Sequence, residues 1–304
     1  MDEKPRVAIL GVTGFIGRGL PEMLVEHGMT CTGISRAGSG NVSGIDHWQT
    51  PENLDLSGYH AVINLAGESV DRRWTAENRQ RFHESRVGMT HRVVQAIRAL
   101  PAVDRPKVLV NASAVGIFGD RGDEMLTEKS ALGTGYLADL CREWEAVAIE
   151  AESLGLRVVR PRIGIVLGHG GSAMGKLLFI FKSGLGGRLG SGRQWMPWIH
   201  LRDLRAALVQ AVLSDSLTGA VNCCAPEAER NADFTRKLAA ALHRSAIFPV
   251  PGFALKLALG GFGGALLASQ HARPAALNAT DFTFRFPNLE SALADLIRQS
   301  SEDC

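Results

Sequence analysis

The chain has 304 residues, the length of two average domains or of one large α/β domain with an extension. Its 45% hydrophobic and 21% charged residues are typical of globular proteins and exclude disordered and fibrous classes. The 33 basic and 31 acidic side chains give a net charge of +2, which argues against a nucleic-acid binder. The five cysteines have no C-x-x-C spacing, so we expect neither disulfides nor a metal site, and we expect a cytoplasmic protein.

Neither a signal peptide nor a membrane-spanning segment is expected. The first residues pass directly into an apolar, strand-like segment without the cationic head and long apolar core of a signal peptide. Residues 257–268 are strongly apolar, but twelve residues with four glycines are too few to span a bilayer, which takes about 20. We therefore expect no membrane partner.

Short apolar, β-branched segments alternate with longer segments of helical periodicity. The expected helices, in which apolar residues recur near i, i+3, i+4 and i+7, are residues 17–27, 76–100 and 136–154. Strands that are apolar throughout and alternate with helices indicate a parallel sheet buried on both faces. With right-handed crossovers, this pattern predicts an α/β, Rossmann-type doubly wound sheet. The expected strands are residues 7–10, 30–34, 61–64, 107–112 and 157–160.

The character of the sequence changes after Gly168. Residues 168–194 are rich in glycine around one short apolar segment, which indicates either unusual backbone close to another group or an exposed loop. We expect a small, mostly helical lobe beyond it, with helices at 203–214, 231–243 and 288–299. The predicted division is a Rossmann-type domain over 1–168, to which 195–225 contribute, and a glycine-rich lid with a small lobe over 169–304.

A glycine turn directly follows the first expected strand and opens the first expected helix. It reads Gly11-Val-Thr-Gly14-Phe-Ile-Gly17, and this strand–turn–helix context is typical of dinucleotide-binding folds. Gly11 permits the tight turn, Gly14 lets the backbone approach a pyrophosphate, and Gly17 lets the helix pack on the strand. We therefore expect a dinucleotide cofactor at this turn.

The end of the second expected strand indicates which nicotinamide cofactor binds. NAD sites place an Asp or Glu there to hold the ribose 2′-hydroxyl, but the segment Gly33-Ile-Ser35-Arg36-Ala-Gly contains no acidic residue. Arg36 offers a planar, charged fork to a 2′-phosphate, and Ser35 offers a hydroxyl beside it. The segment therefore favours NADP(H) over NAD(H); the alternative is that Arg36 is a solvated surface charge.

Two further features lie near the expected cofactor. Asn64-Leu-Ala-Gly67 ends the third core strand, where small residues let a loop lie against a dinucleotide. Arg86 lies on the helix that follows, where it either reaches the cofactor or braces the helix.

Together these segments resemble the extended short-chain dehydrogenase/reductases, and more closely their NAD(P)-dependent epimerase-family branch, which has its own small C-terminal domain. The shared motifs extend over nearly the whole chain. They are Gly-Val-Thr-Gly-Phe-Ile-Gly at 11–17, Asn-Leu-Ala-Gly-Glu at 64–68, Arg-Trp-Thr at 73–75, Ser-Arg at 85–86, Ser-Ala-Val-Gly at 113–116, Trp-Glu at 144–145, Gly-Ile-Val-Leu-Gly at 164–168, Gly-Leu-Gly-Gly at 184–187, Gly-Ser-Gly-Arg-Gln at 190–194 and Trp-Ile-His at 198–200.

The resemblance implies an N-terminal Rossmann domain, a nicotinamide cofactor and a small-molecule substrate that is sugar-like or nucleotide-linked. With the segments above, it predicts a set of cofactor-binding residues that line one edge of the sheet. They are Gly11, Thr13, Gly14, Phe15, Ile16, Gly17, Ser35, Arg36, Asn64, Leu65, Ala66, Gly67, Arg86 and Ile165.

The chain departs from the superfamily at its acid/base pair. The parent superfamily uses Tyr-x-x-x-Lys, in which the tyrosine transfers the proton and the lysine lowers the pKa of the tyrosine and holds the nicotinamide ribose. Neither Tyr59 nor Tyr136 is followed by a lysine four residues later, and the chain has no other tyrosine. Alignment on Glu145 places the missing pair near Leu137 and Cys141, so that Tyr136 points about 100° away around the helix.

Other groups must therefore replace the missing pair, and we predict Ser113, Glu68 and His200 as catalytic residues. In the motif that supplies the assisting hydroxyl in the parent superfamily, Ala114 occupies the matching position here, and Ser113 lies beside it. Glu68 follows the 64–67 turn at the carboxyl end of a strand, where ligands lie in open α/β sheets. The structural alternatives are a solvated loop carboxylate for Glu68 and a half-buried, hydrogen-bonded imidazole for His200. Further candidates are Glu145 and Cys141 for proton transfer, Trp74, Trp195 and Trp198 for stacking on a substrate, and Arg188 and Arg193 of the lid for an anionic substrate.

The sequence predicts an NADP(H)-binding oxidoreductase or epimerase with altered acid/base residues. The alternative is a non-catalytic NADPH-sensing or scaffold protein, which the missing tyrosine and lysine favour, whereas Glu68 and the glycine-rich lid favour an enzyme. Superfamily members often dimerise through the helices after the third and fourth strands. The resemblance thus implies a homodimer through residues 76–100 and 136–154, which a monomer in sedimentation would contradict.

Overall fold

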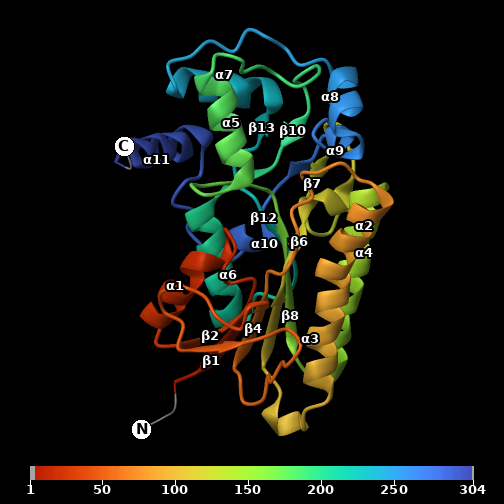
Figure 1. Ribbon diagram of the computed structural model, residues 1–304, viewed down its shortest axis with the longest axis vertical. Helices are drawn as coiled ribbons and strands as arrows, with labels where there is room; N and C mark the ends of the chain where they lie inside the picture. Colours follow the sequence, from red (N-terminus) through yellow and green to blue (C-terminus); the bar gives the residue numbers. More distant parts are fainter. Residues whose placement is uncertain (1–3, 303–304) are drawn as a thin grey trace.

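The computed structural model describes residues 4–302, apart from the side chains of residues 172–173 and 299–302. Its centre is an eight-stranded parallel sheet in the order β12-β8-β5-β4-β1-β2-β3, with the short strand β6 also paired to β8 (Figure 1). The strands of this sheet are β1 (Arg6–Leu10), β2 (Thr30–Ile34), β3 (His47–Gln49), β4 (Ala61–Asn64), β5 (Val108–Asn111), β6 (Ser113–Ala114), β8 (Arg157–Ile163) and β12 (Gly219–Cys223).

The strand order reverses between β1 and β4. From β1 the chain moves outward through β2 to β3, and it then returns to β4 on the other side of β1 and moves outward again. All carboxyl ends of these parallel strands lie at one edge of the sheet, and a doubly wound sheet binds its ligand at this reversal.

Alternation along the strands builds a separate core on each face of the sheet. Val7 and Ile9 pack with helices α1 (Leu20–Glu26) and α6 (Leu201–Leu213). Ala8 and Leu10 face the opposite way, toward α3 (Met89–Arg98) and α4 (Tyr136–Ile149). Helices cover both faces of the sheet, as Figure 1 shows, and the sequence of β1 is therefore almost entirely apolar.

A smaller, mainly helical lobe lies over the carboxyl edge of the sheet (Figure 1). Its core joins Trp198, Phe234 and Leu293 with Phe181. Its helices are α5 (Ser172–Lys182), α7 (Asn231–Ala241), α8 (Gly252–Leu259), α9 (Gly261–Ala265) and α11 (Leu289–Glu302), whereas the short α10 (Ala275–Asn278) packs against β12 and contributes Leu277 to the core of the sheet. Short strand pairs complete it, formed by β9 (Ile165–Leu167) with β11 (Trp198–His200), β10 (Trp195–Met196) with β13 (Glu229–Arg230), and β7 (Met125–Leu126) with β14 (His271–Ala272).

The sheet confirms the predicted doubly wound α/β fold, and the differences from expectation are local. The expected helix 76–100 consists of α2 (Ala76–His83), a π-helical segment at Glu84–Gly88, and α3. The expected strand 157–160 continues to Ile163, because its polar residues pair with β12 and β6. The glycine-rich region contains helix α5, and residues 257–268 contribute to α8 and α9. Within the described part of the chain, no helix has the length and apolar character needed to cross a membrane.

Candidate functional site

The glycine turn is packed so tightly that it has no room for side chains. Gly11 has a φ of +76°, and a Cβ there would lie 2.8 Å from the carbonyl oxygen of Leu65. A Cβ on Gly17 would lie 2.5 Å from the carbonyl oxygen of Gly11. Both Cβ positions point into the protein, so the glycines let the turn pack closely on the loop after β4 and on itself, as the tight turn of a dinucleotide-binding fold requires.

Distant residues hold the same turn in place. Arg205, on α6, donates hydrogen bonds of 2.9 and 2.8 Å to the carbonyl oxygens of Phe15 and Ile16. The ring of Phe15 packs against Gly168 and Gly171, where a Cβ would come within 3.0 and 2.7 Å of the ring. No local motif indicates these contacts, because Arg205 follows Ile16 by 189 residues.

Arg36 lies next to the glycine turn with its side chain exposed. The loop that carries it folds back through a 2.8 Å hydrogen bond from Ser35 Oγ to the carbonyl oxygen of Ser39. A Cβ at Gly40 of this loop would be 3.1 Å from Thr13 Cγ2, so the loop and the turn are neighbours. Arg36 makes no hydrogen bond or ion pair with any described residue, and its guanidinium is available to a ligand.

Asn64, the last residue of β4, holds the backbone of the loop at residues 65–67 in place. Its side chain is fully buried and donates to Asn111 Oδ1 at 2.7 Å and to Thr90 Oγ1 at 3.0 Å, while its Oδ1 accepts from the backbone N–H of Ala66 at 3.2 Å. Asn64 therefore positions the loop backbone, and its side chain does not line the cavity above.

A cavity of about 610 Å³ opens between the carboxyl edge of the sheet and the lobe. Its floor is formed by residues 65–67, 112–116 and 163–165, which follow β4, β5 and β8. The opposite wall includes Phe262, Ala265 and Leu266 of the lobe. Of the predicted cofactor residues, those that line it are Ile16, Leu65, Ala66, Gly67, Arg86 and Ile165.

The cavity contains one basic and one acidic side chain among the described residues that line it, Arg86 and Asp120. Asp120 Oδ1 accepts from the backbone N–H of Ser269 at 3.1 Å, which leaves its carboxylate at the cavity edge. No sequence motif marked Asp120. It reaches the cavity through the loop after β6, whose course depends on contacts with residues about 150 positions further along the chain.

Ser113 lines the cavity, and its hydroxyl is hydrogen-bonded to a buried network of charged side chains. Its Oγ donates to Glu145 Oε1 at 2.7 Å. Glu145 also accepts from Arg162 at 2.8 and 3.0 Å and from Arg160 at 3.2 Å. The carboxylate is neutralised by two guanidinium groups, so Glu145 is a positioning residue for Ser113 rather than a free acid or base.

Leu137 and Cys141, which occupy the positions of the missing tyrosine and lysine, also line the cavity. Burial raises the pKa of the Cys141 thiol to about 12, so it is a neutral thiol at physiological pH. Tyr136 lines the cavity too, but its hydroxyl donates at 3.4 Å to the carbonyl oxygen of Arg79 on α2 and its ring packs on Trp74. Its phenol is thus directed toward α2 and away from the sheet.

The other two predicted catalytic residues do not line the cavity. Glu68 faces Arg72, with 3.9 Å between the charged groups, and its side chain is 35% exposed. His200 is buried at the start of α6, where its Nε2 lies 3.3 Å from Asp295. Burial lowers the pKa of the His200 imidazole to about 4. The structure therefore brings Ser113, of the three, to the cavity.

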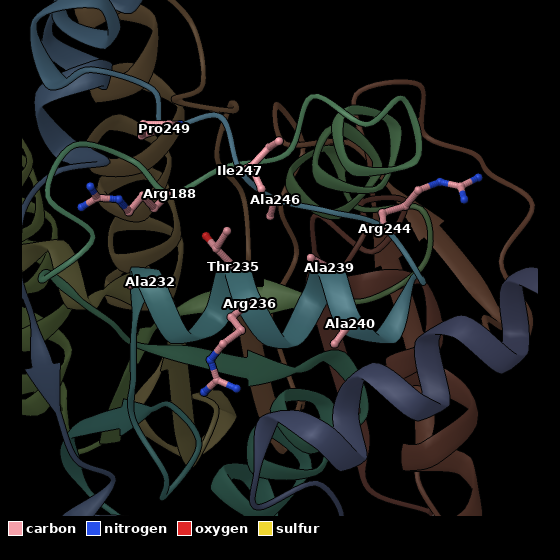
Figure 2. A pocket seen from close by; sticks show the side chains of 10 residues that line it. All are labelled: Arg188, Ala232, Thr235, Arg236, Ala239, Ala240, Arg244, Ala246, Ile247 and Pro249. Atoms are coloured by element: carbon pink, nitrogen blue, oxygen red, sulfur yellow. The ribbon is translucent and has the colours of Figure 1, made fainter.

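The tryptophans and arginines that we predicted as substrate contacts do not all lie at the same cavity. Trp74 and Trp195 line the cavity, whereas Trp198 belongs to the lobe core. Arg193 lines a neighbouring hollow of about 590 Å³, and Arg188 lines another of about 440 Å³ beside α7. Figure 2 shows that the three arginines around the latter, Arg188, Arg236 and Arg244, point in different directions, so they do not converge on one anion. Within residues 4–302, no cluster of three or more His, Cys, Asp or Glu residues is arranged to hold a metal ion.

Comparison with known proteins places these features in a family. Residues 7–224 match the model of the NAD-dependent epimerase/dehydratase family, and residues 250–296 match a domain of unknown function, DUF1731. The chain is 35% identical over 301 residues to the chloroplastic epimerase family protein SDR39U1 homolog of Arabidopsis thaliana, covering 96% of this chain and 86% of that protein. It is 34% identical to an epimerase family protein of Mycobacterium leprae, covering 99% and 98%.

Two solved structures extend the comparison. The human epimerase family protein SDR39U1 (isoform 2), crystallised with NADPH, superimposes with a TM-score of 0.85 at 32% identity, covering 96% of this chain and 99% of that one. A nucleoside-diphosphate sugar epimerase from Corynebacterium glutamicum gives a TM-score of 0.78 at 30% identity, covering 99% of this chain and 61% of that one. The chain belongs to the NAD-dependent epimerase/dehydratase family, as the motifs of its sequence predicted.

Proposed function

We propose that this protein binds NADPH across the strand reversal between β1 and β4 and transfers a hydride between the cofactor and a small-molecule substrate in the cavity. The observation that carries this proposal is the exposed guanidinium of Arg36, without a partner among the described residues, next to a glycine turn with no room for side chains. A human relative, which aligns with this chain over 99% of its own length, was crystallised with NADPH, and this supports the choice of cofactor.

The residues present fit a phosphorylated dinucleotide. The tightly packed glycine turn at Gly11, Gly14 and Gly17 between β1 and α1 suits the pyrophosphate, and Arg36 with Ser35 suits the 2′-phosphate. Residues 65–67 lead from this turn to the cavity, so the nicotinamide half would extend over β4 and β5. When bound, NADPH supplies the hydride.

The chain's own residues would orient the substrate. Ser113 Oγ donates its hydrogen to Glu145, so its lone pairs are free to accept a hydrogen bond from a substrate hydroxyl. Among the described residues that line the cavity, Asp120 is the one with a carboxylate, and we infer that it transfers the proton in place of Glu68, which lies outside the cavity. The nucleoside-diphosphate sugar epimerase among the relatives supports a sugar- or nucleotide-linked substrate.

The first experiment is a calorimetric titration of NADPH and NADH into the wild type, Arg36→Ala and the remote surface control Arg81→Ala. We expect the wild type and the control to prefer NADPH by about tenfold or more, which corresponds to about 1.4 kcal/mol. Arg36→Ala should remove this preference with little change in the affinity for NADH. If neither nucleotide binds the wild type, the proposal is wrong.

Turnover separates an enzyme from the non-catalytic NADPH-sensing alternative. NADPH-loaded protein is mixed with carbonyl substrates, including nucleotide-linked keto sugars, and oxidation of the cofactor is followed by its absorbance. An enzyme oxidises NADPH with at least one of them, and Ser113→Ala slows that reaction without changing NADPH affinity. A protein that binds NADPH tightly and oxidises it with none of the substrates favours the sensing role.

A further inference from the structure

The charge of the chain is distributed unevenly, because two segments of its C-terminal half contain no acidic residue. Residues 169–202 and 234–280 together carry ten lysines and arginines and no aspartate or glutamate. The rest of the chain carries the other 23 basic side chains and all 31 acidic ones, a net charge of −8. The small net charge of the whole chain therefore conceals a basic region in the lobe.

Several cations of this region have no carboxylate partner. Lys176 pairs with Asp71, and Arg236 pairs with Asp233. Four others are exposed and form no ion pair with any described carboxylate, namely Lys182, Arg188, Arg244 and Lys256. Since their charge is not neutralised within the described part of the chain, it is available to attract an anionic partner.

Helix α5 presents large apolar side chains to solvent next to one of its lysines. Phe179 is 74% exposed and Ile180 is 42% exposed. Lys176 precedes them by three and four residues, so the three side chains lie on one face of the helix. The opposite face packs into the core of the lobe through Met174 and Phe181. The exposed face of α5 is therefore both apolar and basic.

Helix α8 and the loop before it repeat this pattern. Phe253 and Leu257 are each 75% exposed, and Lys256 lies beside them at the same helical spacing. Ile247 and Phe248, in the loop between α7 and α8, are exposed as well. This second segment thus combines exposed apolar side chains with a lysine in the same way as α5.

Hydrogen bonds join these segments at the end of the molecule opposite the N-terminus (Figure 1). Arg244 Nε donates to the carbonyl oxygen of Lys182 at 3.3 Å. The backbone N–H of Val250 donates to the carbonyl oxygen of Arg188 at 2.9 Å, and α8 begins two residues later. We call the exposed cations and apolar side chains of residues 176–188 and 244–257 the basic–apolar surface. Neighbouring apolar side chains that remain exposed commonly mark a contact site for a partner.

The form of the basic–apolar surface fits a layer of anionic lipid better than a protein. Phe179, Phe253 and Leu257 line none of the three cavities described above, so they form no pocket for an anchoring side chain of a protein partner. Arg188 and Arg244 point apart (Figure 2), so they do not converge on one phosphate or carboxylate. Lipid headgroups present a diffuse negative charge that needs no such convergence, and aromatic and aliphatic side chains enter the boundary between headgroups and acyl chains.

We propose that the basic–apolar surface binds the face of a membrane that contains anionic lipids. Phe179, Phe253 and Leu257 enter the headgroup region, and Lys182 and Lys256 lie at the lipid phosphates. This proposal replaces our expectation of no membrane partner, which rested on the absence of a segment long enough to span a bilayer, because a surface contact needs no such segment. It goes beyond the proposed function and does not depend on it, since neither the cofactor nor the cavity takes part.

The test is co-sedimentation of the full chain with vesicles of phosphatidylcholine, with and without phosphatidylserine. One variant combines Phe179→Ser with Phe253→Ser, and another combines Lys182→Glu with Lys256→Glu. The matched controls are Val103→Ser, at a side chain that is 91% exposed outside the lobe, and Arg92→Glu on the exposed side of α3. Thermal unfolding followed by circular dichroism reports that each variant is folded.

We expect the wild type and both controls to bind vesicles that contain phosphatidylserine, and to be released by high salt because salt screens the headgroup charge. Phosphatidylcholine alone should bind them at least about tenfold more weakly. Each double variant should lose about tenfold or more of the affinity for the anionic vesicles, since each removes one of the two contributions.

The remaining outcomes contradict the proposal. If the wild type does not bind the anionic vesicles, or binds both kinds of vesicle equally, the proposal is wrong. If the lysine variant loses binding and the phenylalanine variant keeps it, the contact is purely electrostatic and would suit an acidic protein equally well. If the controls lose as much as the double variants, binding does not occur at this surface. A dimer in sedimentation velocity that the phenylalanine variant converts to a monomer, without vesicle binding, would show that a second copy covers the surface instead.

Discussion

The burial of His200 predicts how the stability of the protein depends on pH. Its pKa is lowered from 6.5 to about 4 by burial, with Asp295 opposing this shift and Arg202 and Arg285 adding to it. The unfolded chain therefore binds the proton more readily than the folded one, and the free energy of unfolding falls as the pH drops from about 6.5 to about 4. We expect His200→Gln to remove up to roughly 3 kcal/mol of this loss.

The measurement for His200 is urea unfolding at several pH values. His47→Gln is the matched control, since His47 is exposed, and it should keep the pH slope of the wild type. An unchanged slope in His200→Gln would show that another group, such as His271, whose pKa burial also lowers, dominates this pH range.

The buried network behind Ser113 predicts a large loss of stability when one partner is removed. Arg162 is 4% exposed and binds both oxygens of Glu145, so Arg162→Met leaves the buried carboxylate with the Ser113 hydroxyl and one cation, Arg160, at 3.2 Å. We expect a loss of about 3–5 kcal/mol in the free energy of unfolding, measured with denaturant. Arg81→Met, which breaks an exposed pair with Glu77, should cost less than about 1 kcal/mol. Equal effects of the two variants would contradict the role of burial.

At the scale of elements, the junction of β1, the glycine turn and α1 depends on Gly17. A Cβ there would meet backbone atoms at 2.5 and 2.7 Å, and backbone cannot move aside cheaply. We expect Gly17→Ala to destabilise the fold by about 1–3 kcal/mol and to weaken NADPH binding, as measured by thermal unfolding and calorimetry. Gly175→Ala is the control, because nothing lies within 4 Å of its Cβ position in α5 and alanine favours helix. A Gly17→Ala variant with the stability and NADPH affinity of the wild type would disprove this packing argument.

The elements differ in how well local sequence predicts them. Strands β2 and β4 begin and end at the predicted residues, because a strand buried on both faces is a short apolar run bounded by polar residues. Helix α9 was not predicted, because its five residues include three glycines, which disfavour helix. It forms where Gly261 packs on the ring of Trp74 and Gly263 on the backbone of Leu255, contacts that local sequence does not encode.

At the scale of the whole molecule, the candidate site also combines features that local sequence predicts with features that it does not. The glycine turn, Arg36 and the loop at 64–67 were predicted because each is marked by a few consecutive residues. Asp120, Arg205 and the direction of Tyr136 depend on contacts between segments far apart in the chain, so no motif indicates them. His200 was predicted as catalytic because it lies in a shared motif, yet its Nε2 lies 3.3 Å from Asp295 of α11, about 95 residues further along the chain.

Contacts between the lobe and the sheet predict that the molecule unfolds as one unit. Lys176 of α5 pairs with Asp71 at 2.5 Å, and Arg73 donates at 2.8 Å to the carbonyl oxygen of Leu257 on α8. The ring of Phe15 joins the glycine turn to Gly168 and Gly171. These contacts enclose the cavity in which the cofactor would lie, so binding of NADPH should stabilise both parts together.

We therefore expect a single transition in scanning calorimetry, which NADPH moves to higher temperature. At a concentration 100 times its dissociation constant, NADPH should add about 2.7 kcal/mol to the free energy of unfolding. The same concentration should add less to Arg36→Ala, because that variant has lost the fork for the 2′-phosphate. Two transitions, of which NADPH moves one, would show that the lobe unfolds independently and that the sheet binds the cofactor without it. The cavity between them would then form by closure of the lobe after the cofactor has bound.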